Sequence, residues 1–280
     1  MSNAFDEWIG REETHTQRID AAAVQAMAAT LDLERAPVAG EPLPPGWQWL
    51  FFNPAARRSG LGADGHPRRG GFLPPIELPR RMWAGSRIAY CADLPIGSEA
   101  TRRSRIAKIE NKVGKRGSLW FVTVEHTTQS GGKTCIVEEQ DIVYREAPPP
   151  GAVTAAPDRY EGQPRWGRDV RPDTTLLFRY SALTFNGHRI HYDRRYVTEV
   201  EGYPGLIVHG PLIATLLVDL LRRERPGAAF ARFEFRAVRP TFDIAPFAVR
   251  GRPGPDGRTF HLWAEDADGW LTMQATATLA

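Results

Sequence analysis

Residues 183–193, LTFNGHRIHYD, concentrate side chains that can hold or move protons. His188 and His191 lie three positions apart, and an asparagine, a tyrosine and an aspartate stand close to them. Histidine exchanges protons near neutral pH, so such a pair can act as a catalytic base or acid. Three explanations fit the pattern: a metal site, a catalytic base with its helpers, or an ordinary polar turn.

The metal site is the least favoured of these explanations. A His-x-x-His pattern in a turn, with no cysteine nearby, is not typical of a zinc site. The chain has 2 cysteines, Cys91 and Cys135, which cannot form a four-ligand site by themselves. Both lie in strand-like runs, so we expect them to be buried as small apolar residues without a disulfide. We therefore predict no metal.

Composition places the chain among soluble globular proteins. It has 280 residues, of which 42% are hydrophobic and 25% charged, enough for one large domain or two smaller ones. Its longest apolar run, LIATLLVDLL, is about half of the roughly 18 residues that a membrane-spanning helix needs. The N-terminus lacks the layout of a signal peptide, and the net charge of +3 shows no basic stripe. We expect a cytoplasmic protein that binds neither membrane nor nucleic acid.

A stretch rich in proline and glycine divides the sequence into two halves. We predict an N-terminal domain over 1–147, a linker over 148–172 and a C-terminal domain over 173–280. The N-terminal half begins with a strand and a helix at 13–32, and four strands follow a long irregular excursion at 36–80. The length of the excursion suggests a loop that covers a binding pocket. Its aromatic residues fit a buried cluster equally well; these are Trp47, Trp49, Phe51 and Phe52.

The C-terminal half is easier to read. Residues 174–184 are predicted as a strand that runs into the histidine motif. The segment 209–227 reads as a helix that is apolar on nearly all sides, which indicates a helix wrapped by other structure. Strands with alternating apolar residues follow at 231–238, 247–252, 257–266 and 269–280. The pattern predicts a central helix cradled by a curved antiparallel sheet, and the similar outline of the first half suggests a duplicated domain.

The motif, together with VHGPLIATLL, resembles the MaoC-like hydratases and dehydratases. The likeness is strongest over 178–223. It points to the double-hotdog branch that contains the 3-hydroxyacyl-thioester dehydratases and the mesaconyl-C4-CoA (3-methylfumaryl-CoA) hydratases. The N-terminal half is similar to the degenerate dehydratase domain of that branch. The resemblance implies an α+β double hotdog, in which two antiparallel sheets are each wrapped around a central helix.

The resemblance also implies roles for residues of the motif. His191 falls on the catalytic histidine of the family, and Asp193 falls on its closing acid. The position five residues before His191 holds Asn186, where the wider family has an aspartate. An amide cannot accept a proton at working pH, so this departure shifts the acid–base work to His191, helped by His188. The N-terminal half contains no copy of this catalytic stretch, so one active site per chain is expected.

Other residues complete the predicted site. The N–H of Gly210, at the positive end of the second-half helix, is a candidate donor to the thioester oxygen. Asn186 and Asp193 also fit a role in shaping the turn, and Asp193 one in orienting His191. His209 either caps the helix or lines the pocket, and Tyr180 lines the site. Arginines that could hold a CoA phosphate or a substrate carboxylate are Arg179, Arg189, Arg194, Arg195, Arg236 and Arg239.

These observations predict an enzyme that reversibly hydrates a short-chain 2-enoyl-CoA. Mesaconyl-C4-CoA is the preferred substrate and a malyl-type CoA the product. A 3-hydroxyacyl-thioester dehydratase and an itaconyl-CoA hydratase are the nearest alternatives, a thioesterase is more distant, and a non-catalytic acyl-CoA-binding protein is an alternative of another class. Phosphate-loop and dinucleotide motifs are absent, so no cofactor is expected beyond the CoA thioester. The fold leads us to expect a homodimer.

Overall fold

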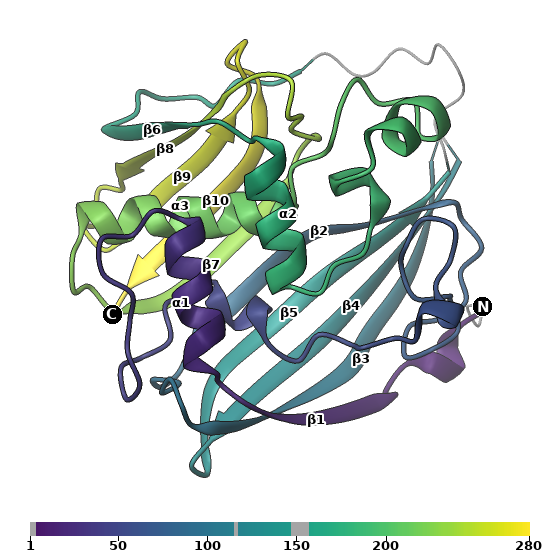
Figure 1. Ribbon diagram of the computed structural model, residues 1–280, viewed down its shortest axis with the longest axis horizontal. Helices are drawn as coiled ribbons and strands as arrows, with labels where there is room; N and C mark the ends of the chain where they lie inside the picture. Colours follow the sequence, from purple (N-terminus) through teal and green to yellow (C-terminus); the bar gives the residue numbers. More distant parts are fainter. Residues whose placement is uncertain (1–3, 115–116, 147–156) are drawn as a thin grey trace.

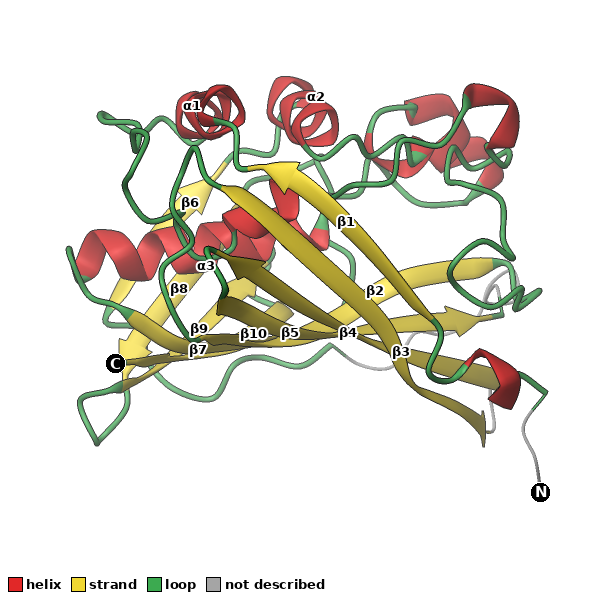
Figure 2. Cartoon of the chain, turned by 90° about the horizontal axis from the view of Figure 1, so that it is seen from below, coloured by secondary structure: helices red, strands yellow, loops and turns green. Residues whose placement is uncertain are grey.

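The computed structural model describes residues 4–114, 117–146 and 157–280. Ten antiparallel strands form one curved sheet, and helices and long loops cover its concave face (Figures 1 and 2). The strands are β1 (Glu12–Arg18), β2 (Arg80–Tyr90), β3 (Glu99–Gly114), β4 (Gly117–Ser130), β5 (Lys133–Arg145), β6 (Trp166–Val170), β7 (Phe230–Ala237), β8 (Phe247–Pro253), β9 (Thr259–Glu265) and β10 (Leu271–Leu279). The helices are α1 (Ala21–Thr30), α2 (Thr174–Leu183) and α3 (Gly210–Glu224). Shorter helical turns are η1 (Asp6–Trp8), η2 (Trp47–Leu50), η3 (Arg58–Gly60), η4 (Arg189–His191) and the π turn η5 (Tyr196–Val200).

The strand order, β1-β3-β4-β5-β2-β7-β10-β9-β8-β6, repeats one arrangement in each half. Counted outward from the centre, β2 corresponds to β7, β5 to β10, β4 to β9, β3 to β8 and β1 to β6. The halves join through β2 and β7, where Ser86 lies opposite Phe235. The double-hotdog fold class is therefore confirmed, and its two antiparallel sheets are continuous across this junction.

Helix α3 is the central helix of the C-terminal half. Pro211 lies in its first turn, where the missing N–H is harmless, and all residues from Leu212 to Leu221 are buried. One of them is Asp219, whose carboxylate is paired with Arg168 at 3.2 Å and Arg223 at 2.8 Å. The helix packs against β6, β8, β9 and β10. Burial on all sides is what the apolar sequence of this segment predicts.

The N-terminal half differs from this plan in its third layer. Helices α1 and α2 each follow the first strand of their half and lie side by side above α3 (Figure 2). At the corresponding place after α1, the described residues contain no long helix like α3, and the chain instead runs through the irregular segment 31–79. The aromatic residues of this segment are buried, as the second alternative predicts, and they belong to the main core of the protein; they are Trp47, Trp49, Phe51 and Phe52.

Three local predictions are wrong. Residues 174–184 form α2 and no strand, because the side chain of Asp173 accepts a hydrogen bond from Leu176 N and starts a helix. Residues 166–170, placed in the linker, form β6 and pair with β8; 147–156 lie outside the described residues, and the other domain boundaries stay predictions. Cys135 is buried as expected, but Cys91 is exposed. No helix within the described ranges is long and apolar enough to cross a bilayer.

Candidate active site

His191 is held at the centre of the motif by the turn η4. Its side chain is buried, with 7% of the residue surface exposed. Nδ1 lies 2.7 Å from the carbonyl oxygen of Ile207 and donates a hydrogen bond to it. This bond fixes the tautomer, so Nε2 carries the lone pair and can accept a proton.

The surroundings keep the His191 ring neutral. Burial lowers its pKa to about 4, against the smaller raising effect of the hydrogen bond to Ile207. The ring stacks on His209, with ring centroids 3.7 Å apart and planes 18° from parallel. A neutral imidazole with a free Nε2 has the form that a general base needs at neutral pH.

His209 lines the site and does not cap α3 with its side chain. The residue is the N-cap of the helix, but its ring makes no capping hydrogen bond. Its Nε2 lies 2.8 Å from the hydroxyl of Ser181, and its ring lies 5.0 Å from that of Tyr180. Burial lowers the pKa of His209 well below its usual value and raises the pKa of Tyr180. Tyr180 is almost fully buried, and its ring lies against that of His209.

The polar residues of the motif hold its loop in shape. Oδ1 of Asn186 accepts a hydrogen bond from the backbone N–H of His188 at 3.0 Å. Asp193 forms an ion pair with Arg189 at 2.7 Å and accepts the backbone N–H of Tyr196 at 3.0 Å. The backbone carbonyl of Ile207 orients the His191 ring, so Asp193 does not orient this ring in the structure.

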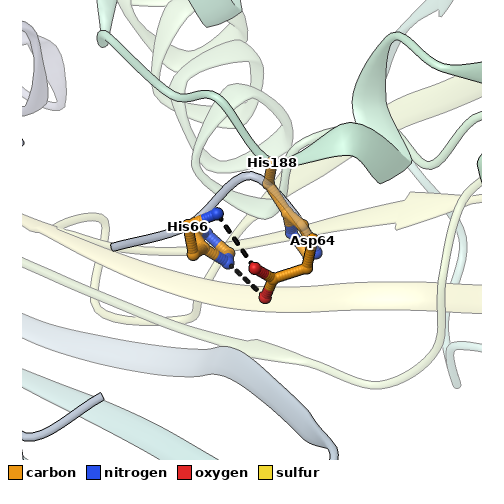
Figure 3. A group of neighbouring side chains, drawn as sticks. All are labelled: Asp64, His66 and His188. Atoms are coloured by element: carbon orange, nitrogen blue, oxygen red, sulfur yellow. Dashed lines mark hydrogen bonds and ion pairs between the residues drawn. The ribbon is translucent and has the colours of Figure 1, made fainter. Parts of the chain in front are cut away.

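Two residues that sequence reasoning did not select reach the motif from the excursion. Figure 3 shows the Asp64 carboxylate facing His66, with His188 coming to the same place from the motif. Oδ1 of Asp64 accepts the His66 backbone N–H at 3.0 Å, and Oδ2 lies 3.4 Å from His66 Nδ1. The His66 ring lies 4.0 Å from that of His188. The tripeptide Asp-Gly-His at 64–66 resembles Asn-Gly-His at 186–188. This similarity is the sequence feature that could have identified Asp64 and His66.

The four histidines form a continuous line of rings, which we call the histidine row: His66, His188, His191 and His209. The rings of His188 and His191 lie 5.5 Å apart and complete the line. Burial is the main cause that lowers the pKa of both His66 and His188, and it outweighs the opposing effect of Asp64. Burial raises the pKa of Asp64 itself, but the hydrogen bonds from His66 outweigh it and hold that pKa below its usual range. The row is therefore neutral at pH 7 and ends on an ionised carboxylate.

Asp64, His66 and His188 are the residues that could hold a metal. One potential ligand atom from each lies within 4.8 Å of the others. In a tetrahedral zinc site with bonds of about 2.1 Å, neighbouring ligand atoms stand roughly 3.4 Å apart. Oδ2 of Asp64 and Nδ1 of His66 lie 3.4 Å apart, a distance that also fits the hydrogen bond between them, and the rings of His66 and His188 face each other with planes 36° apart. The group forms a hydrogen-bonded Asp–His pair beside a second imidazole, and the absence of a metal stays a prediction.

Gly210 is the first residue of α3 and lies next to the row. Among the described residues, no acceptor takes its backbone N–H, which points out of the first turn of the helix. A Cβ built on Gly210 would meet only Met273 Cε, at 4.0 Å. The protein thus leaves open space beside a free N–H at the positive end of a buried helix, which suits a thioester oxygen that gains negative charge.

Solved structures of other proteins have a similar fold. HtdX of Mycobacterium tuberculosis has a similar fold, with a TM-score of 0.66 at 18% identity over 96% of this chain and 100% of HtdX. A second protein of that organism, described as having a double hotdog fold, matches with a TM-score of 0.59 at 13% identity over 97% of this chain and 96% of its own. At these identities the likeness concerns the fold alone.

The sequence comparisons are more specific. The mesaconyl-C(4)-CoA hydratase of Chloroflexus aurantiacus is 49% identical over 97% of this chain and 96% of that protein. The sequence profile of the family described as hydroxyacyl-thioester dehydratase type 2 matches residues 46–243, which contain the excursion turn, the motif and α3. The chain therefore belongs to the hydroxyacyl-thioester dehydratase type 2 family.

Proposed function

We propose that the protein adds water reversibly across the 2,3 double bond of a short-chain enoyl-CoA, and that mesaconyl-C4-CoA is the substrate. Family membership makes the chain a hydro-lyase. The relative that is 49% identical over nearly the whole length of both chains carries the name of this substrate. The observation that carries the reaction is the buried, neutral ring of His191, with Nδ1 bonded to Ile207 and Nε2 left to take a proton from water.

The reaction follows from the positions of two groups. As the water oxygen bonds to carbon 3, Nε2 of His191 takes one of its protons, and the double-bond electrons move toward the thioester oxygen. The N–H of Gly210 donates to that oxygen and stabilises its negative charge. When the enolate collapses, the imidazolium returns the proton to carbon 2. The elements of one water are added without a net change of oxidation state, so the step needs no redox cofactor.

A mesaconyl group carries a free carboxylate, which needs a cation inside the pocket. Most arginines named from the sequence are already engaged. Arg189 is paired with Asp193, and Arg194 with Asp243. Arg195 and Arg239 likewise form ion pairs, with Glu199 at 2.8 Å and Asp266 at 3.8 Å, and Arg179 and Arg236 are exposed.

Arg81 is the arginine that best fits the substrate carboxylate. It lies on β2 directly opposite the fully buried Tyr144, so it faces the concave side of the sheet. Within the described part of the chain, no acidic side chain forms an ion pair with it. Burial is the largest cause that lowers the pKa of His66 and His188, and the positive charge of Arg81 adds to the lowering, so its guanidinium acts on the histidine row.

The reaction is tested by adding purified protein to mesaconyl-C4-CoA and to crotonyl-CoA, a neutral short enoyl-CoA. Loss of the enoyl-thioester ultraviolet absorbance reports hydration. We expect the wild-type protein to hydrate mesaconyl-C4-CoA with the higher kcat/KM, and His191→Ala to lower both rates. Failure to hydrate any short enoyl-CoA, and to dehydrate the 3-hydroxyacyl-CoA products, contradicts the proposal and favours a binding protein.

The role of Arg81 has its own test. Arg81→Gln is expected to lower kcat/KM for mesaconyl-C4-CoA about 100-fold, because a charged hydrogen bond to the carboxylate is lost, and to change crotonyl-CoA hydration little. Arg87→Gln is the matched control, since Arg87 lies on the same strand and its side chain is paired with Glu139 and Asp141. An equal loss for both substrates would exclude Arg81 as the carboxylate-binding residue.

The proposal also includes a homodimer in the cytoplasm, as expected for a hotdog enzyme without a membrane-spanning helix among its described residues. Light scattering of the purified protein measures the assembly directly. A monomer that retains full hydratase activity would remove the dimer from the proposal and leave the chemistry intact.

A further inference from the structure

Two turns with the same design meet at the site, one from each half of the chain. Residues 64–66 read Asp-Gly-His and residues 186–188 read Asn-Gly-His. In each turn, the Oδ1 of the first residue accepts the backbone N–H of the histidine at 3.0 Å. The turns are in backbone contact, because a Cβ built on Gly65 would lie 2.0 Å from the carbonyl oxygen of Gly187.

The turns differ in one atom that decides their charge. The first residue is a carboxylate in the N-terminal turn and a neutral amide in the C-terminal turn. A backbone hydrogen bond also joins the two segments: the N–H of Arg189, which follows the second turn, donates to the carbonyl oxygen of Asp64 at 2.9 Å. Position 186 therefore keeps the geometry of its turn without a negative charge, while position 64 supplies that charge a few ångströms away, beside His66 and His188.

The reaction creates a need for such a charge. While the proton taken from water resides on the histidine row, the row carries one positive charge, and His191, which takes the proton, is buried. Among the described residues, the fixed charges that act on the row are the Asp64 carboxylate and the Arg81 guanidinium. Ser181 and Tyr180 on α2 and the imidazoles themselves are neutral, and Arg189, which donates to the carbonyl oxygen of Ala63 beside the Asp64 turn, is paired with Asp193.

We propose that Asp64 supplies, from the N-terminal half, the carboxylate that is absent at position 186. It acts through His66 and His188 as the counter-ion of the histidine row and does not itself touch the substrate. No bond to Asp64 forms or breaks: the proton passes from water to His191 and then to carbon 2, and Asp64 stabilises the imidazolium state in between. This role rests on the proposed hydration, since only a proton transfer makes the row positive.

Asp64→Asn tests the role because it removes the charge and keeps the Oδ1 acceptor of the turn. We expect kcat/KM on the plateau to fall about 10- to 100-fold. The acid limb of the pH profile should move to lower pH, because an imidazolium without its counter-ion gives up its proton more easily. Asp256→Asn is the matched control: Asp256 also accepts backbone N–H groups of its own turn, at 2.8 Å from Thr259 N, and is exposed. It should leave the profile unchanged.

The reverse exchange sharpens the test. Asn186→Asp adds a second carboxylate beside the row, so the acid limb should move to higher pH. In the Asp64→Asn background, the same substitution should recover part of the lost rate, since it restores one negative charge to the paired turns. A rate loss in Asp64→Asn without movement of the acid limb would show a purely structural role and overturn the proposal.

Two further measurements separate this proposal from its rivals. Proton NMR of the histidine ring C–H groups, in wild type and Asp64→Asn, follows the titration of the row without any substrate. If the wild-type protein hydrates no enoyl-CoA, the proposed function fails. If the histidines titrate identically in wild type and Asp64→Asn, the counter-ion role of Asp64 is overturned. Stoichiometric bound metal, with activity lost on chelation and regained with zinc, would make Asp64, His66 and His188 a metal site and overturn the proposal.

Discussion

The two halves of the molecule share one sheet plan but differ in what covers it. In the C-terminal half, the long helix α3 fills the curve of the strands and presents Gly210 to the site. In the N-terminal half, the irregular segment 31–79 follows α1, and it brings a turn with Asp64 to the catalytic motif. The strands thus provide a common frame, and the covering layer of each half brings different polar groups to the histidine motif.

The largest expected effect concerns the half that carries the base. His191→Gln keeps a polar side chain of similar size but cannot take a proton at neutral pH, so kcat/KM should fall about 1000-fold. His261→Gln, on β9 away from the row, is the comparison. Steady-state hydration assays measure both variants. Activity of His191→Gln within a few-fold of wild type would remove His191 from the chemistry.

Helices α3 and α1 are also expected to contribute differently to the free energy of unfolding. Leu217 is fully buried in α3, and Leu217→Ala should lower the free energy of unfolding by about 3 to 4 kcal/mol. Met27→Ala in α1 should cost less, about 2 kcal/mol, because α1 has buried residues on one face only. Urea unfolding followed by circular dichroism compares them. An equal or larger cost for Met27→Ala would mean that the two layers contribute alike.

The contact between the paired turns can be broken at Gly65. Its φ is +86°, and a Cβ would clash with the carbonyl oxygen of Gly187, so Gly65→Ala must push the turns apart. We expect kcat/KM to drop about 10-fold or more. Gly10→Ala is the control, since Gly10 has a φ of +85° but nothing within 4 Å of its Cβ position. Equal kinetics of the two variants would show that the turns need not touch.

Acid should weaken the fold through the histidine row. The row is neutral, with His191 and His209 buried and His66 and His188 partly buried, whereas its members in the unfolded chain bind protons below about pH 6.5. The unfolded state therefore gains protons that the folded state excludes, and stability should fall as the pH drops from about 6.5 toward the lowered value of about 4 for His191. Thermal unfolding at a series of pH values measures this. His191→Gln should flatten the slope, and an unchanged slope would contradict the assignment.

The smallest effect is expected at Gly210. A methyl group fits there without a clash, so Gly210→Ala should leave the melting temperature nearly unchanged. The same methyl group would occupy space above the free N–H, so we expect KM to rise and kcat to fall by less than about 10-fold. A loss of stability with normal kinetics would assign this glycine to packing.

Sequence reasoning predicted those elements whose periodicity is local. The alternation around Phe233 and Phe235 gave β7, and the apolar run of 212–221 gave the buried helix α3. The prediction of a strand at α2 was wrong because ten residues carry little helical periodicity. The local sign of a helix is its N-cap, Asp173. The motif histidines were likewise selected by their spacing.

Asp64, His66 and Arg81 were missed for a different physical reason. Their part in the site depends on contacts between residues far apart in the chain, and a loop with turns but no repeating pattern gives no local sign of its partners. The excursion was expected either to lie over the acyl pocket or to contribute a buried aromatic cluster; its aromatic residues fill the main core, and its tip meets the motif. Only the matching Asp-Gly-His and Asn-Gly-His tripeptides linked the two places.

The junction of β2 with β7 has one more consequence. In an assembly of two identical subunits, symmetry would force the facing turns to carry the same residue, either aspartate on both sides or asparagine on both. Because both halves belong to one polypeptide here, each turn can diverge independently, and the pair holds one acid and one amide. A single chain that contains both halves can thus hold an asymmetric pair of turns, which two identical subunits cannot.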